Sequence, residues 1–85
     1  MKWNNVREQY PDKWLLFLDA ESYVEGERRI IEELAPIQAY VNYYDAWRHY
    51  RRLHEENPTN RYFVYHTSND EIVIKLQKWI GVRGR

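Results

Sequence analysis

The pattern that organises this chain lies in residues 13–41, KWLLFLDAESYVEGERRIIEELAPIQAYV. Lys13 to Val24 is predicted to be a strand, because its apolar run supplies hydrophobic side chains to both faces at one end. Glu25-Gly26-Glu27 favours a hairpin turn, since glycine adopts positive φ at little cost. Arg28 to Val41 is compatible with a strand or a helix. Pro36 argues against one long helix there and favours an irregular edge strand that pairs with the first.

A helix is predicted from Asn42 to Asn57, directly after this hairpin. Asn42 suits the N-cap, and Asp45 lies three residues on, as in a loose capping box. Pro58 ends the helix. The apolar stripe of this helix comprises Tyr43, Ala46, Trp47, Tyr50, Leu53 and His54. We expect the helix to bury Trp47, Tyr50 and Leu53 against a sheet face built from Trp14, Leu16, Leu18 and Val64.

Shorter segments complete the predicted fold. Trp3 to Tyr10 is expected to form a short helix, and Arg61 to His66 a central strand of alternating β-formers. Ser68 to Glu71 has the spacing of a capping box, but the β-branched residues 72–74 favour a turn followed by a short strand. The apolar segment Trp79 to Val82 is expected to pack on the core.

Length and composition place the chain in one class. Its 85 residues make a single domain, with 13 basic against 13 acidic side chains and no cysteine. No apolar run approaches the ~18 residues of a membrane span, and no leader is visible at the start, so a cytoplasmic location is expected. We predict an α+β domain over residues 1–85, with a short N-terminal helix and a small antiparallel sheet packed against one amphipathic helix. The sheet is a hairpin plus one or two further strands.

The aromatic content of the chain suggests a binding role. Four Trp, eight Tyr and two Phe are many for so small a core, because each buried ring removes about 150–250 Å² from water. Charge is also uneven: residues 1–42 hold five basic and eight acidic side chains, and residues 43–85 hold eight and five. These features favour a non-catalytic protein-interaction module that self-associates. The candidate interaction residues are Tyr44, Tyr65, His66 and Trp79.

Nucleic-acid binding is the alternative, because the predicted helix interleaves cations with aromatic rings between Trp47 and Arg52. Its candidate residues are Arg48, Arg51, Arg52, Lys75 and Lys78. Glu55 and Glu56 lie four residues after Arg51 and Arg52 and partly neutralise them. The pI of about 6.8 is also far below the value above ~9 that is typical of nucleic-acid-binding domains.

Catalytic and metal-binding patterns are weak. His49 and His54 do not share a helix face, so no metal site is expected. Asp19 and Glu21 would project from one strand face, where a solvated acidic sheet edge is the expected role. His66-Thr67-Ser68 is the one local polar cluster, but no glycine-rich oxyanion or phosphate loop accompanies it. We therefore expect neither an enzyme nor a bound cofactor.

Three motifs give the chain a likeness to other sequences: Trp3…Tyr10-Pro11-Asp12-Lys13-Trp14-Leu15-Leu16, then His66-Thr67-Ser68, then Lys78-Trp79-Ile80-Gly81-Val82-Arg83. With these motifs it resembles, over most of its length, a family of short bacterial proteins of unknown function. The resemblance implies a bacterial cytosolic protein with a small β-β-α-β domain and an extended segment after the first turn. It transfers no catalytic or binding residue.

Overall fold

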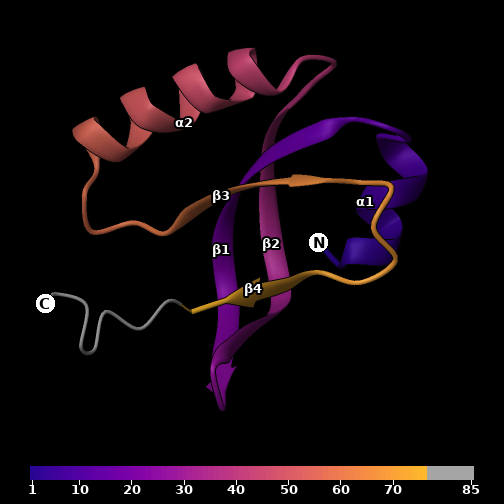
Figure 1. Ribbon diagram of the computed structural model, residues 1–85, viewed down its shortest axis with the longest axis vertical. Helices are drawn as coiled ribbons and strands as arrows, with labels where there is room; N and C mark the ends of the chain where they lie inside the picture. The colour runs from indigo at the N-terminus through magenta and orange to yellow at the C-terminus, as the bar shows by residue number, and fades with distance from the viewer. Residues whose placement is uncertain (77–85) are drawn as a thin grey trace, which may run out of the picture.

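A computed structural model describes residues 1–76 as two helices and a four-stranded antiparallel sheet of order β3-β1-β2-β4 (Figure 1). The elements are α1 (Trp3–Gln9), β1 (Trp14–Glu25), β2 (Arg28–Tyr40), α2 (Tyr43–Glu56), β3 (Tyr62–His66) and β4 (Val73–Lys75). The predicted α+β class, with a helix packed against the sheet, is confirmed. Trp79 to Val82, expected to pack on the core, lies outside the described residues. No helix within residues 1–76 is long and apolar enough to cross a membrane.

The long hairpin β1–β2 forms as predicted, and Gly26 takes the positive φ of 63° at its turn. Irregularities in pairing occur near Phe17 and on either side of Glu21, and such bulges bend the strands they interrupt. β4 pairs only with Arg28–Ile30 on the other side of β2. Pro36 lies beyond that pairing, where its missing N–H is tolerated.

The expected central position of the third strand is wrong, because β3 is an edge strand that pairs only with β1. The sequence of β3 has the apolar pattern of a central strand because its side chains contact protein on both faces of the sheet. Phe63 and Tyr65 pack against the core cluster on one face, and Tyr62 is buried on the other, beneath α2. The predicted turn and short strand after His66 are confirmed, and no helix begins at the Ser68 capping-box spacing.

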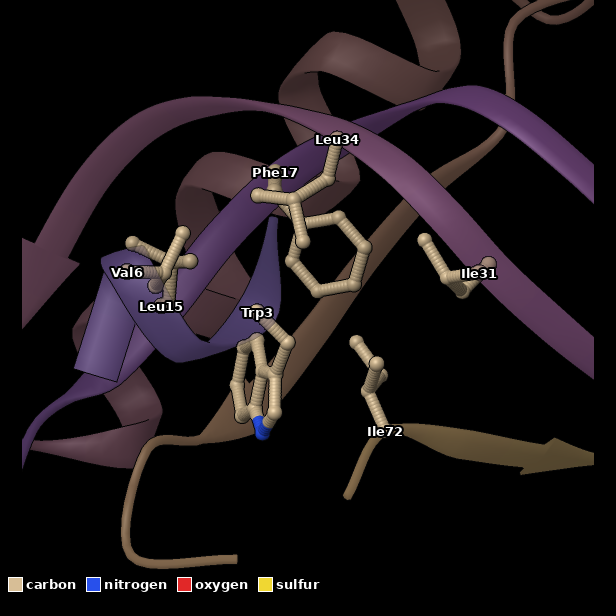
Figure 2. Close-up of a cluster of buried hydrophobic side chains, with 7 residues drawn as sticks. All are labelled: Trp3, Val6, Leu15, Phe17, Ile31, Leu34 and Ile72. Carbon is tan, nitrogen blue, oxygen red and sulfur yellow. The ribbon is translucent and has the colours of Figure 1, made fainter. Parts of the chain in front are cut away.

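The main core lies on the α1 face of the sheet, as Figure 2 shows. Its buried members are Trp3, Val6, Leu15, Phe17, Ile31, Leu34 and Ile72. The Trp3 and Phe17 rings meet with centroids 6.4 Å apart. Alternation along β1 sends Leu15 and Phe17 to this face and Leu16 to the α2 face.

The rotation predicted for α2 is wrong. Ala46 is the residue that α2 buries, whereas Trp47 remains 38 % exposed and Tyr50 and Leu53 are half-buried. The small alanine lets the helix backbone approach the sheet closely, which leaves the larger rings at its flank. His54, placed in the predicted apolar stripe, is exposed.

The start of α2 is capped as predicted, but the capping box does not close. Asn42 Oδ1 accepts a hydrogen bond from the Tyr44 N–H at 2.7 Å. The Asp45 carboxylate instead accepts a bond from the Arg48 guanidinium at 2.9 Å. The N-terminus of α2 is therefore held by a single side-chain cap.

Candidate interaction surface

Three aromatic side chains form a row along the flank of α2 that faces β3. Tyr43, Trp47 and Tyr50 follow one another at intervals of about one helical turn, so they lie on the same side of the helix. Together with residues 62–64 of β3 they line a cavity of about 230 Å³. The flank of α2 and the edge of the sheet thus enclose a groove with aromatic walls.

The aromatic surface continues toward solvent at the beginning of α2. Tyr43, Tyr44 and Trp47 line a second hollow of about 260 Å³. Tyr44 is 69 % exposed and the preceding Val41 is 80 % exposed. We call Val41, Tyr43, Tyr44 and Trp47 the α2 aromatic surface. The expectation that some rings of this chain would be exposed is confirmed here.

A chain of ring contacts anchors this surface to the sheet. Trp14 meets Tyr43 edge-on, with ring centroids 4.8 Å apart, and meets His66 in the same way at 4.8 Å. On the other side of the helix, the Tyr40 hydroxyl and His49 Nδ1 are hydrogen-bonded at 2.7 Å. These contacts hold the beginning of α2 on the ends of β1 and β2, so the exposed rings are presented from a fixed scaffold.

His66 takes part in a polar cluster at the end of β3. Ser68 lies 2.8 Å from His66 Nδ1 through its hydroxyl and donates its backbone N–H to the same atom at 3.2 Å. Asp12 lies 3.8 Å from His66 Nε2, but its side chain is 90 % exposed. A hydrolytic site would also require oxyanion donors and an enclosed substrate position. The contacts instead fix the turn that follows β3.

The structure does not bring the four predicted interaction residues together. Tyr44 and His66 lie on the α2 side of the sheet. Tyr65 lies on the opposite face, where it packs edge-on against Trp3 with ring centroids 5.7 Å apart. Trp79 lies outside the described residues. Sequence reasoning missed Tyr43 as an interaction residue, although its position four residues before Trp47 could have signalled the row.

The basic residues of the nucleic-acid alternative are also separated. Arg48 pairs with Asp45, while Arg51 lies 3.6 Å from Glu55 and stacks over the Trp47 ring at 5.5 Å. Arg52 is exposed on α2. Lys75 pairs in register with Arg28 beside the hairpin turn, at the other end of the hairpin from α2 (Figure 1). Lys78 lies outside the described residues.

Asp19 departs most from its predicted role as part of a solvated acidic edge. Its side chain is only 2 % exposed, and its Oδ2 accepts hydrogen bonds from Ser22 at 2.5 Å and from Arg61 at 3.0 Å. Arg29 lies 3.9 Å from the same oxygen, and Oδ1 is buried without a partner. This carboxylate therefore links β1 to Arg29 of β2 and to Arg61 directly before β3, whereas Glu21 beyond the bulge is exposed.

Within residues 1–76 no group of three or more His, Asp or Glu side chains is arranged to hold a metal ion. Comparison of the chain with protein-family models, curated proteins and solved structures found no match. The resemblance to a bacterial family therefore stays a prediction, and function has to be inferred from the surface just described.

Proposed function

We propose that this chain is a non-catalytic protein-interaction module that self-associates through the α2 aromatic surface. The observation that carries the proposal is the concentration of exposed apolar side chains at the beginning of α2. Tyr44 and Val41 are both more than two-thirds exposed there, and Trp47 and Tyr43 are beside them. Contiguous apolar patches of this kind mark interaction sites on small proteins.

The chemistry of these side chains supports binding. Tyrosine and tryptophan dominate the energetics of protein interfaces, because they bury a large area and lose few rotamers. The ring contacts of Trp14 with Tyr43 already restrict part of the surface, which lowers the entropy cost of ordering it on binding.

The overall charge is compatible with a second copy as partner. The chain has 13 basic and 13 acidic side chains, so two copies approach without net repulsion. The basic face of α2 supports nucleic-acid binding less well, since Arg48 and Arg51 already pair with carboxylates of their own helix.

Sedimentation velocity over a concentration series tests the proposal. We expect the wild-type chain to shift from monomer to dimer below ~1 mM, and Tyr44→Ser to weaken that shift at least about tenfold. Tyr23→Ser is the matched control, because Tyr23 is also exposed but lies near the hairpin turn. A wild-type chain that stays monomeric up to that concentration contradicts the proposal.

A further inference from the structure

The hydrogen-bond pattern between β1 and β3 shows which main-chain groups of β3 face outward. The Asp19 N–H donates to the Arg61 carbonyl oxygen at 2.9 Å. At the other end, the Thr67 N–H donates to the Lys13 carbonyl oxygen at 2.8 Å. Because hydrogen-bonded residues alternate along an antiparallel strand, the odd-numbered residues 61–67 bond to β1. The N–H and C=O groups of the even-numbered residues between them point away from the sheet.

Two of these outward residues, Tyr62 and Val64, have no hydrogen-bond partner for their main chain among residues 1–76. His66 is different, because its carbonyl oxygen accepts bonds from the Asn69 N–H at 3.2 Å and the Asn69 side chain at 2.9 Å. Edge strands are usually protected against pairing by lysine, proline or a bulge. Residues 62–65, YFVY, contain neither residue and pair with β1 in unbroken register.

On the other side of the hairpin, the outer side of β2 is covered at two places. β4 pairs with Arg28–Ile30 of β2, and further along β2 the Leu34 N–H donates to the Met1 carbonyl oxygen at 3.0 Å. The Met1 ammonium donates to the Leu34 carbonyl oxygen at 2.8 Å. The other edge strand, β4, is only three residues long and ends in Lys75, two features that protect an edge, whereas β3 has neither.

We propose that β3 pairs edge to edge with β3 of a second copy, antiparallel and centred on Phe63. This inference rests on the proposed self-association and specifies its geometry. In this register Tyr62 of each copy lies opposite Val64 of the other. The outward N–H and C=O groups then form up to about four hydrogen bonds between the copies. Residues 62–64 carry no charge, so no ionised group is desolvated along the new ladder.

The position of α2 explains why the occupant is a second copy. α2 contacts both β3 and β1, and its aromatic row shares a cavity with residues 62–64. Pairing of the two edges would separate the two β1 strands by three strand spacings, about 14 Å, and set the two α2 helices side by side on one face. Packed helices lie ~8–10 Å apart, so bulky side chains are needed to fill the remaining space. Tyr43 and Trp47, half-exposed in one protomer, supply that volume from both sides.

A proline substitution on the outward-facing residue tests this geometry. Val64→Pro removes an N–H that points away from β1, so the protomer is expected to fold. Val64→Ala is the matched control, because it loses the same side-chain packing but keeps the donor. We expect Val64→Ala to dimerise within about threefold of the wild-type dissociation constant, and Val64→Pro to weaken dimerisation at least about thirtyfold.

Amide hydrogen exchange of the wild-type chain provides a readout that does not depend on a variant. We expect the amides of Tyr62 and Val64 to exchange fast at low concentration and to become protected as the dimer forms. The amides of Phe63 and Tyr65, which bond to β1, are expected to be protected at both concentrations.

The other outcomes separate edge pairing from self-association. Equal dimerisation of Val64→Pro and Val64→Ala would overturn edge pairing and leave self-association standing. Protection of the Tyr62 and Val64 amides that does not change with concentration would show that a part of the same chain covers β3, which also overturns edge pairing. A wild-type chain that never dimerises would overturn both proposals.

Discussion

The two faces of the sheet differ in how completely they are closed. On the α1 face, a helix of only seven residues packs Trp3 and Val6 against the sheet, and a continuous buried cluster results. On the α2 face, a helix twice as long buries Ala46 and leaves Trp47 and Tyr43 partly exposed. The longer helix thus covers its face of the sheet less completely, because the one residue that it buries is an alanine, whereas α1 buries a tryptophan and a valine.

This difference suggests that one face mainly stabilises the fold and the other is available for binding. The face with large side chains pointing inward supplies most of the folding free energy, because apolar area removed from water stabilises the fold in proportion. On the α2 face, where the buried side chain is Ala46, the large rings of Tyr43 and Trp47 stay partly exposed beside it. Those rings stay available for binding. Substitutions on the α1 face are therefore expected to lower mainly the unfolding free energy, and substitutions on the α2 face to weaken mainly self-association.

The largest effect is expected at the centre of the closed face. Phe17→Ala is expected to lower the unfolding free energy by about 3–5 kcal/mol, because the fully buried ring leaves a cavity under Trp3. Urea unfolding at low protein concentration measures the change. Tyr23→Ala, at an exposed position, is the control and is expected to stay within about 0.5 kcal/mol of wild type. A loss below 1.5 kcal/mol for Phe17→Ala, roughly half the lower bound, would show that this face is open as well.

The next effect is expected at Asp19, which continues the row of Leu15 and Phe17 along β1. Asp19→Ala leaves Arg29 partly buried beside no carboxylate, so we expect a loss of about 3 kcal/mol, the low end of the range for a broken buried pair. Arg61 keeps contact with water and moderates the cost. Asp45→Ala breaks an exposed pair and is expected to cost about 1 kcal/mol or less in the same urea titration. Equal costs for the two variants would contradict the buried role of Asp19.

A smaller effect on folding is expected on the open face. Trp47→Ala is expected to cost about 1 kcal/mol in the monomer, well below the value for a buried tryptophan, because part of the ring is already in water. The same variant is expected to weaken self-association by at least about tenfold. Chemical unfolding at low concentration and sedimentation at high concentration separate the two quantities. A folding loss near that of Phe17→Ala would mean that α2 is rotated toward the sheet.

The smallest effect concerns Glu33, at the edge of β2 where Met1 is bound. The hydrogen bond from the N-terminal ammonium, followed by that from Lys2, holds the pKa of Glu33 below its ordinary value. The stability it contributes is present above the unfolded pKa and is lost as pH falls through the folded pKa. Glu33→Gln is therefore expected to flatten the acid side of a stability profile, recorded between about pH 5 and pH 3 by thermal unfolding. The exposed Glu32→Gln is the control, and identical profiles for wild type and Glu33→Gln would contradict the ion pair.

Sequence reasoning located most of the elements, since their signals are local. Gly26 marked the hairpin turn, Asn42 and Pro58 bounded α2, and Pro36 argued against a second helix within β2. Reasoning failed where the answer depends on what lies beside an element. It placed β3 at the centre of the sheet, because an apolar edge strand covered on both faces has the same pattern as a central one.

The sequence predicted that aromatic rings would be exposed, but it did not predict which residues form the candidate site. An excess of rings over core volume can be read from composition, and Tyr44 was named on that basis. The row formed with Tyr43 and Trp47 depends on how α2 is rotated about its own axis. Helical periodicity does not fix that rotation closely enough to say which residue of the apolar stripe is buried. Tyr65 was also named, but it packs against Trp3 on the face opposite α2. Strand alternation groups the residues of β3 into two faces but does not say which face α2 will cover.

The amino-acid order by itself determined where this chain turns, where its helices begin and end, and that it holds more aromatic surface than so small a core needs. These properties follow from backbone conformational preference and from side-chain area, which each residue carries with it. Tertiary structure alone decided that Ala46 is the buried residue of α2, that Asp19 is buried beside two arginines, and that β3 is an edge strand. Those outcomes depend on which surfaces exclude water from one another, and that is fixed only when all elements pack together.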